Sequence, residues 1–288
     1  MGQTAPDNPV AAAGHSNTPA ASMLSRTVRF CINPDGSADG PNGFGGRPAM
    51  RGLGRYYELT CTLRGNPDPQ TGYIVGIQEI DSAVRKSLIP FIADACRTSP
   101  HTEPAALLPS LWELAEAAFA HPLQRLSWSL TPTYRVEMTM TDRLASPPRV
   151  LIRQKFDFAA AHRLHSPELS AEENRATFGK CNNPSGHGHN YQIEPAVALP
   201  VALADGFSLA SLEQIVEDHV IDVFDHKHLN TDTPDFDPAR GGMIPSVEHI
   251  AMVCFDRLAE PVRQLGEGAE LLRITVWETD RTSCTYPA

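Results

Sequence analysis

The chain has 288 residues, enough for two domains, and its 41% hydrophobic and 20% charged residues are ordinary for a globular protein. Its 24 Lys and Arg against 34 Asp and Glu give a formal net charge of -10, which argues against a general nucleic-acid or anionic-membrane binder. No uncharged apolar run approaches the roughly 20 residues that span a bilayer. The six cysteines are scattered, without a CxxC pair or a secretory signal, so we expect reduced thiols and a cytoplasmic protein.

Composition along the chain predicts a tail and two folded units. Residues 1–24 are rich in Ala, Pro, Asn, Ser and Gly without apolar periodicity, so we expect a disordered tail. A transit peptide is the alternative, but the segment has no arginine before Arg26. Residues 25–143 and 150–288 form the two units, and residues 144–149, which contain two prolines, form the linker between them.

The two units resemble each other when the first is shifted by 134 positions. The identities are Phe44-Gly45 with Phe178-Gly179, Gly52 with Gly186, Gly54 with Gly188, Tyr57 with Tyr191 and Gly72 with Gly206. The order of expected elements also repeats, from a strand and a Gly-rich loop through a second strand and two helices to a last strand. In the first unit Pro109 is expected to open the second of these helices. The pattern predicts a tandem repeat of one fold.

The elements of the second unit follow from periodicity. Residues 149–161 carry apolar side chains at even steps, which predicts a strand. Residues 208–224 place apolar side chains on one helical stripe, and Ser246 is a good N-cap for a helix through Leu258. Residues 272–277 are rich in β-branched residues and predict a last strand. Strand pairs with helices on one side give an α+β unit.

Two histidines open an expected strand in His187-Gly188-His189. Residues i and i+2 of a strand share a face, so these imidazoles, about 7 Å apart along the strand, can converge on one ion. His162, at the end of the preceding strand, can supply a third imidazole. Three histidine ligands with an open fourth position are typical of a catalytic zinc site. Two exposed loop histidines without a metal are the alternative.

Three further positions have residue types suited to catalysis or binding. Asp225-His226 follows the long helix, and a carboxylate beside an imidazole suits proton transfer. Glu278 ends the last strand, where a carboxylate can accept paired N–H donors from a heterocycle. Solvated ends of the helix and the strand are the alternatives. Cys181 can be a zinc ligand, a catalytic thiol or inert, and nearby zinc would lower its pKa below the usual ~8.5.

Five motifs in chain order resemble the 6-pyruvoyl-tetrahydropterin synthase family, and together they cover the second unit from end to end. They are Phe158-Ala-Ala-Ala-His162-Arg-Leu, Phe178-Gly-Lys-Cys-Asn-Asn-Pro-Ser-Gly-His-Gly-His-Asn-Tyr191, Phe224-Asp-His-Lys-His-Leu-Asn230, Ser246-Val-Glu-His-Ile-Ala251 and Val276-Trp-Glu-Thr-Asp280. The resemblance implies a T-fold (tunnelling fold), which is a four-stranded antiparallel sheet with two helices on one face, assembled by trimers into barrels.

The resemblance also implies a zinc-dependent lyase that converts 7,8-dihydroneopterin triphosphate into 6-pyruvoyl-tetrahydropterin and triphosphate, as in tetrahydrobiopterin biosynthesis. Five residues separate Cys181 from His187, whereas the related 6-carboxytetrahydropterin synthases of queuosine biosynthesis have a shorter spacing. Relatives of the folate pathway tend to replace this cysteine by Glu. The queuosine-pathway synthase and a non-enzymatic pterin-binding or scaffold protein remain the alternatives.

Site residues are carried over from the resemblance motif by motif. Zinc would be held by His162, His187 and His189. Proton transfer would be performed by Cys181 as a general base and by the pair Asp225 and His226. The pterin ring would be anchored by Glu278, helped by Glu248 and the hydroxyl of Ser246. We expect His228 and His249 to be bystanders.

The first unit has none of these groups. At the same shift Leu53 and Arg55 stand at the positions of His187 and His189, and Arg47 stands at that of Cys181. We therefore expect a degenerate T-fold that serves assembly, with an unrelated α+β domain as the alternative fold and an independent pterin or nucleotide site as the alternative role.

The expected partners are the pterin triphosphate substrate and further copies of the chain, without nucleic acid or membrane. In the family the Asp-His pair comes from a neighbouring subunit, so second units are expected to lie next to second units in a trimer of tandem chains. Within the second unit Glu194-Pro195 interrupts the strand that begins at His187. This position is expected to be an edge or a bulge, because proline cannot donate a hydrogen bond to a sheet.

Overall fold

The computed structural model describes residues 21–40 and 42–288. Most of the expected tail lies outside these ranges, and residues 22–24 at its end already belong to the first strand. In the described part of the chain, no helix combines the length and the apolar composition needed to cross a membrane.

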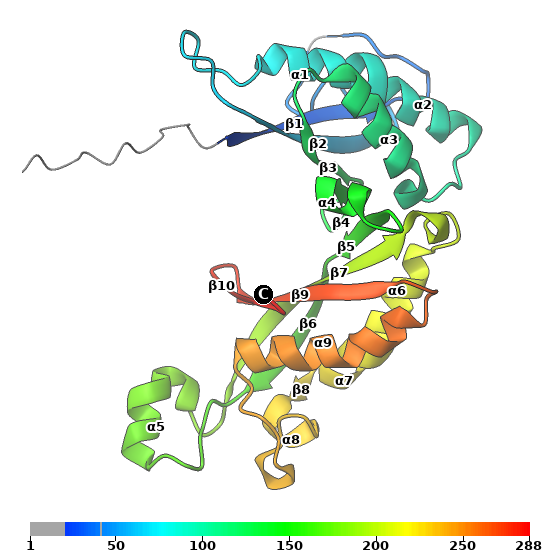
Figure 1. Cartoon of the computed structure of the whole chain (residues 1–288). Helices are drawn as coiled ribbons and strands as arrows, with labels where there is room; N and C mark the ends of the chain where they lie inside the picture. The colour runs from blue at the N-terminus through cyan, green and yellow to red at the C-terminus, as the bar shows by residue number, and fades with distance from the viewer. Residues whose placement is uncertain (1–20, 41) are drawn as a thin grey trace, which may run out of the picture.

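The first unit is an antiparallel meander with helices on one face (Figure 1). Its strands pair in chain order: β1 (Ser22–Ile32), β2 (Arg55–Gly65), β3 (Leu123–Ser129) and β4 (Tyr134–Thr139). Its helices are α1 (Ile77–Ala83), the π-helical turn η1 (Val84–Leu88), α2 (Ile89–Thr98), α3 (Pro104–Ala118) and the short α4 (Met140–Leu144). Alternate residues of β2, from Tyr57 through Leu59 to Leu63, are buried in the core.

Helix α3 begins earlier than the sequence predicts. Pro104 lies in its first turn, where a missing N–H costs no hydrogen bond, and Pro109 lies inside the helix. The expected start at Pro109 is therefore wrong, because a proline in the first turn and an interior proline give similar sequence signals.

The second unit is built around one central strand, β7 (His187–Pro200). On one side β7 pairs with β5 (Arg149–Gln154) and β6 (Phe156–His162); on the other it pairs with β9 (Glu270–Thr279), which in turn pairs with β10 (Thr282–Tyr286). The main helices are the continuous run α6 (Leu209–Val216), η4 (Glu217–Ile221) and α7 (Asp222–Phe224), followed by α9 (Val247–Arg263). The architecture is α+β with a mostly antiparallel sheet, as expected.

Shorter helices, turns and one short strand connect the main elements of this unit. Helix α5 (Ala171–Phe178) projects from its lower end (Figure 1), and the turn η2 (Gly179–Asn182) follows it. The remaining pieces are η3 (Val201–Leu203), β8 (Lys227–His228), α8 (Leu229–Asp232) and η5 (Pro238–Arg240). Strand β8 runs parallel to β6, at residues 160 and 161.

Local sequence signals correctly located the main elements. The helix expected over residues 208–224 is present, and the Ser246 hydroxyl caps α9 by accepting the N–H of His249 at 3.4 Å. Helix α9 continues past the expected end at Leu258 because Val262 extends its buried stripe. The strand expected over residues 149–161 is split at Lys155 into β5 and β6.

Pro195 lies in the central strand rather than at an edge. It pairs with Ile274 of β9, while on its other side β6 pairing ends at Ile193 and β5 pairing begins at Ala196. The Pro195 nitrogen, which has no hydrogen to donate, therefore faces the break between β5 and β6, where no strand needs the donor. The expected edge position is wrong, and the irregularity in β9 pairing comes one residue later, between Ala196 and Val197.

The two units share one continuous sheet, because β4 of the first pairs with β5 of the second. Buried charges cross this junction: the Arg153 guanidinium lies 2.8 Å from Glu137 Oε1 and 3.6 Å from Glu194 Oε1, and Arg135 donates to Glu194 at 2.7 Å. The β5 edge of the second unit is therefore already occupied by β4 of the same chain, so the expected contact between second units of a trimer would have to use another surface.

Candidate metal centre and active site

Three histidines converge at the ends of β6 and β7. His162 pairs with His187 across the two strands, and the alternation of β7 puts His189 on the same face. The Nε2 atoms of His162 and His187 lie 3.1 Å apart, and one ring nitrogen from each of the three histidines lies within 4.8 Å of the others. The structure therefore brings together the three predicted ligands, and the alternative of two exposed loop histidines is wrong.

The ring orientation of His162 is fixed from the far side. Its Nδ1 lies 2.7 Å from the carbonyl oxygen of Pro245, just before α9, and 3.2 Å from the Tyr191 hydroxyl. A proton on Nδ1 that is donated to the carbonyl leaves the Nε2 lone pair facing the other histidines. Burial lowers the pKa of His162 to about 4, so its imidazole is neutral, as a metal ligand must be.

The donor set fits a zinc ion. Ligand atoms of a tetrahedral zinc with Zn–N bonds of ~2.0–2.1 Å lie roughly 3.3 Å apart, close to the separation of the first two rings. The buried Nε2 of His189 has no hydrogen-bond partner in the described part of the chain, a costly state for a nitrogen unless another group occupies the centre. Burial also lowers the pKa of His187, with a further contribution from the charge of His189.

Glu278 lies beside the histidines. Its Oε1 is 3.4 Å from His162 Nε2 and 3.7 Å from His189 Nε2, and the side chain is mostly buried. The alternative of a solvated strand end is therefore wrong. From the sequence we expected this carboxylate to bind the substrate. In the structure it lies next to the candidate metal ligands.

Cys181 and Glu278 both lie near the Tyr191 hydroxyl. Burial raises the pKa of Tyr191, and electrostatic interaction with Glu278 and Cys181 raises it further. The loop that carries Cys181 is tied to the end of β6 by the N–H of Leu164, which donates to the Cys181 carbonyl at 2.9 Å. The thiol is partly exposed and is not engaged in a disulfide.

Asp225 and His226 form a pair on the opposite face of the sheet. The carboxylate lies 2.6 Å from His226 Nδ1 and accepts the N–H of Ala159 at 2.8 Å; this backbone hydrogen bond is the main cause of the lowered pKa of Asp225. His226 has φ 56, an uncommon value for a residue other than glycine, and its side chain is 83% exposed.

The pair does not hydrogen-bond to the histidine cluster within one chain, although His226 and His189 border one open hollow of about 470 Å³. The pair also borders a hollow of about 500 Å³ with Asp157, Ala159, Asn190 and Gln192, which alternate with the residues on the histidine face. Among the described residues, no hydrogen bond or ion pair links Asp225 or His226 to His162, His187, His189 or Glu278.

The remaining predicted residues surround the start of α9. Ser246 is the N-cap of α9. Its hydroxyl also hydrogen-bonds to Glu248, and this is the main reason that the pKa of Glu248 is lowered. His249 Nδ1 lies 2.7 Å from the Ile244 carbonyl oxygen. The His228 ring packs against Gly186, because a Cβ atom added to that glycine would come within 2.6 Å of His228 Nε2.

Sequence reasoning assigned no role to two groups of the site, the Tyr191 hydroxyl and the Pro245 carbonyl. Tyr191 had a usable signal, because it lies two residues after His189 on the same face of the strand. The Pro245 carbonyl had none, because 83 residues separate it from His162.

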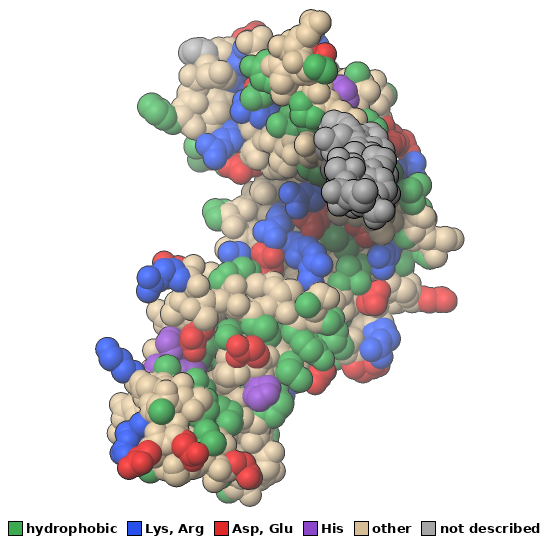
Figure 2. Space-filling view, turned by 60° about the vertical axis from the view of Figure 1, so that its left-hand side comes forward, with side chains coloured by type: hydrophobic (Ala, Val, Ile, Leu, Met, Phe, Trp, Pro, Cys, Tyr) green, Lys and Arg blue, Asp and Glu red, His purple; other side chains and the backbone are tan. Residues whose placement is uncertain are grey.

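In the space-filling view, histidine side chains are exposed on the lower half of the molecule (Figure 2).

Comparisons with known proteins concern the half that carries this centre. Residues 151–288 match the family model of 6-pyruvoyl tetrahydropterin synthase. The human 6-pyruvoyl tetrahydrobiopterin synthase is 36% identical over 137 residues, which cover 47% of this chain and 89% of the human protein. A putative 6-pyruvoyl tetrahydrobiopterin synthase of Caenorhabditis elegans is 35% identical over 141 residues, covering 48% of this chain and 95% of the relative.

A solved structure of Caenorhabditis elegans 6-pyruvoyl tetrahydropterin synthase has 33% sequence identity and a TM-score of 0.41, and covers 48% of this chain and 95% of its own. The resemblance read from the five motifs is confirmed by the family match and by the human relative. Through its C-terminal half, the chain belongs to the 6-pyruvoyl tetrahydropterin synthase family.

Proposed function

We propose that this protein is a zinc-dependent lyase that converts 7,8-dihydroneopterin triphosphate into 6-pyruvoyl-tetrahydropterin and triphosphate. The observation that carries the proposal is the convergence of His162, His187 and His189, with the His162 ring fixed by the Pro245 carbonyl. The relatives are named for a 6-pyruvoyl pterin product, and the cluster supplies the metal ligands that such chemistry needs.

Each predicted group has a defined task in this reaction. Zinc bound by the three histidines would act as a Lewis acid on the side-chain hydroxyls of the substrate. Cys181 would remove a proton from a side-chain carbon, and His226, oriented by Asp225 at 2.6 Å, would transfer a proton at the adjacent carbon. Glu278 would accept the N–H donors of the pterin ring, with Glu248 and Ser246 beside it.

Incubation of the purified protein with dihydroneopterin triphosphate tests the reaction. Formation of 6-pyruvoyl-tetrahydropterin, identified by mass spectrometry, supports the proposal. A 6-carboxytetrahydropterin product would instead favour the queuosine-pathway activity. Tight pterin binding without turnover would favour the non-enzymatic alternative.

We further propose a homo-oligomer in which the Asp225-His226 pair of one chain completes the zinc centre of another. Its support is the placement of the pair and the histidine cluster on opposite faces of the same strands. Mixing Cys181→Ala and His226→Ala chains should then restore some activity, and light scattering should give a mass above that of one chain. A fully active monomer would contradict this assembly.

We also propose that residues 25–143 are a T-fold repeat without metal. The support is the shared strand, strand, helix, helix, strand, strand order of both units.

A further inference from the structure

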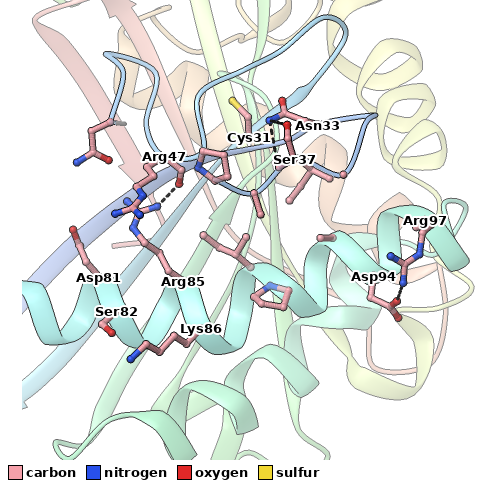
Figure 3. A pocket seen from close by; sticks show the side chains of 18 of the residues that line it. Cys31, Asn33, Ser37, Arg47, Asp81, Ser82, Arg85, Lys86, Asp94 and Arg97 are labelled. Carbon is pink, nitrogen blue, oxygen red and sulfur yellow. Dashed lines mark hydrogen bonds and ion pairs between the residues drawn. The ribbon is translucent and has the colours of Figure 1, made fainter. Parts of the chain in front are cut away.

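A cavity of about 730 Å³ opens in the first unit, far in sequence from the candidate catalytic groups (Figure 3). Its roof is the loop between β1 and β2, and its floor is the helical run from α1 to α2. The volume lies in the range of about 300–1,000 Å³ that is typical of small-molecule sites.

The roof is held in place by specific hydrogen bonds. The buried Asn33 amide donates to the carbonyl oxygens of Ser37 and Ala49, and its side-chain oxygen accepts the N–H of Arg51 at 2.8 Å. The N–H of Cys31 donates to the Pro48 carbonyl at 3.2 Å. The loop is therefore anchored to the end of β1 at several points, which gives the cavity a preformed shape.

Four cationic and two acidic side chains line the cavity: Arg47, Arg85, Lys86, Arg97, Asp81 and Asp94. Both carboxylates already have partners. Asp81 accepts two hydrogen bonds from Arg26, at 2.8 and 2.9 Å, and Asp94 pairs with Arg97 on the same helix.

The remaining three cations are not paired with a carboxylate, although the charge of Asp81 acts on Arg85. Within the described ranges, no ion pair involves Arg47, Arg85 or Lys86. The Arg85 guanidinium donates to the carbonyl of Arg47, so the two arginines lie together at one end of the cavity (Figure 3). Burial lowers the pKa of Arg85, the charge of Asp81 raises it, and the charges of Arg47 and Arg26 lower it further, so a bound anion would offset the charges of the two other arginines.

We propose that this cavity binds a phosphorylated organic molecule of metabolite size, with its phosphate against the guanidinium groups of Arg47 and Arg85 and with the Lys86 ammonium group farther away as a third positive charge. Guanidinium groups match phosphate oxygens in geometry and charge, and three cations suit a multiply charged group. A phosphate alone would fill a small part of the volume, and the apolar walls formed by Ile32, Ile89 and Pro90 suit an organic portion. The chain as a whole has a formal charge of -10, but the excess of cationic side chains in this cavity attracts anions there.

Calorimetric titration of the full-length protein with AMP, ATP, inorganic phosphate and inorganic triphosphate tests the site. We expect at least one of the two nucleotides to bind one site per chain, more tightly than inorganic phosphate. Arg47→Glu and Lys86→Glu should each weaken that binding by about tenfold to a hundredfold, the effect of losing a charged hydrogen bond. Arg64→Glu, on an exposed arginine of β2 outside the cavity, is the matched control and should leave the affinity unchanged.

The variants also separate this site from the centre of the second unit. Nucleotide binding that persists in both Arg47→Glu and Lys86→Glu would place the ligand elsewhere and overturn the proposal, as would the absence of nucleotide binding to the wild-type chain. Both side chains are exposed, and thermal unfolding verifies that each variant is folded. Because the readout is binding, a failure here leaves the proposed lyase activity untouched.

Discussion

Strands β1 and β2 of the first unit pair in the same way as β6 and β7 of the second, yet among the described residues only the second unit has a cluster of candidate metal ligands. Phe30 pairs with Tyr57 in the first unit as Phe158 pairs with Tyr191 in the second, and the ring centroids lie 5.9 and 5.1 Å apart. Two main helical segments and then two strands follow in the same order in both. The shared aromatic pair supports packing of the strands in each unit.

The same register shows what replaces the histidines. Ile32 pairs with Arg55 as Ala160 pairs with His189, so Arg55 corresponds to His189, Leu53 to His187 and Pro34 to His162. The match of Leu53 and Arg55 to His187 and His189 that was made from the sequence agrees with this register. The first unit forms its sheet without a metal ligand at any of these positions, so the fold of the second unit is not expected to depend on zinc.

The largest contrast between the units is expected in metal content. His189→Ala should reduce bound zinc from one per chain to none while the fold is retained, because one of three ligands is lost. Arg55→Ala, at the corresponding position of the first unit, should leave zinc unchanged. Elemental analysis of both variants decides the point, and two zinc ions per wild-type chain or full zinc in His189→Ala would refute the assignment.

Removal of the Cys181 thiol should separate catalysis from metal binding. Cys181→Ala should keep zinc and fold but lower turnover by about 10²–10⁴-fold, the usual contribution of a general acid or base. The control is Cys96→Ala in the first unit, whose thiol lies 3.9 Å from the Tyr57 hydroxyl and should not affect turnover. Loss of zinc from Cys181→Ala would make this cysteine a ligand instead.

The second unit should also respond to pH through His162. Its pKa is about 4 in the folded chain against 6.5 in the unfolded one, so only the unfolded chain takes up this proton between those values. The unfolding free energy of the zinc-free protein should therefore fall as pH decreases from 6.5 to 4, by on the order of 3 kcal/mol from this group. Urea unfolding of the wild type and of His162→Gln checks this, and an equal pH dependence in both would contradict it.

The smallest effect concerns the paired tyrosines. Tyr191→Phe removes the hydroxyl 3.2 Å from His162 Nδ1 and should weaken zinc binding by about tenfold, as is typical for a group that orients a ligand. Tyr57→Phe removes the corresponding hydroxyl of the first unit and should leave zinc affinity unchanged. Competition with a zinc chelator measures both variants, and equal zinc affinities would show that the Tyr191 hydroxyl does not support the ligand.

Much of this comparison was predictable from the sequence where the signal was local. The i and i+2 histidines share a strand face because strand geometry has a period of two, and Ser246 caps α9 because its hydroxyl reaches an N–H three residues away. The five motifs identified the family in the same way, since each is a short run of neighbouring residues. The predicted start of α3 at Pro109 was wrong because two prolines five residues apart, Pro104 and Pro109, both give a local signal for a helix start.

Tertiary structure decided which distant groups meet. The Pro245 carbonyl orients His162, Glu278 comes beside the histidines, and Pro195 is accommodated in a central strand opposite the break at Lys155. The pairing of β4 with β5 and the positive cavity of the first unit likewise depend on which strands become neighbours. Such contacts join residues far apart in the chain, and periodicity and capping act only over a few residues, so the sequence determines the ligands and elements while packing determines their partners.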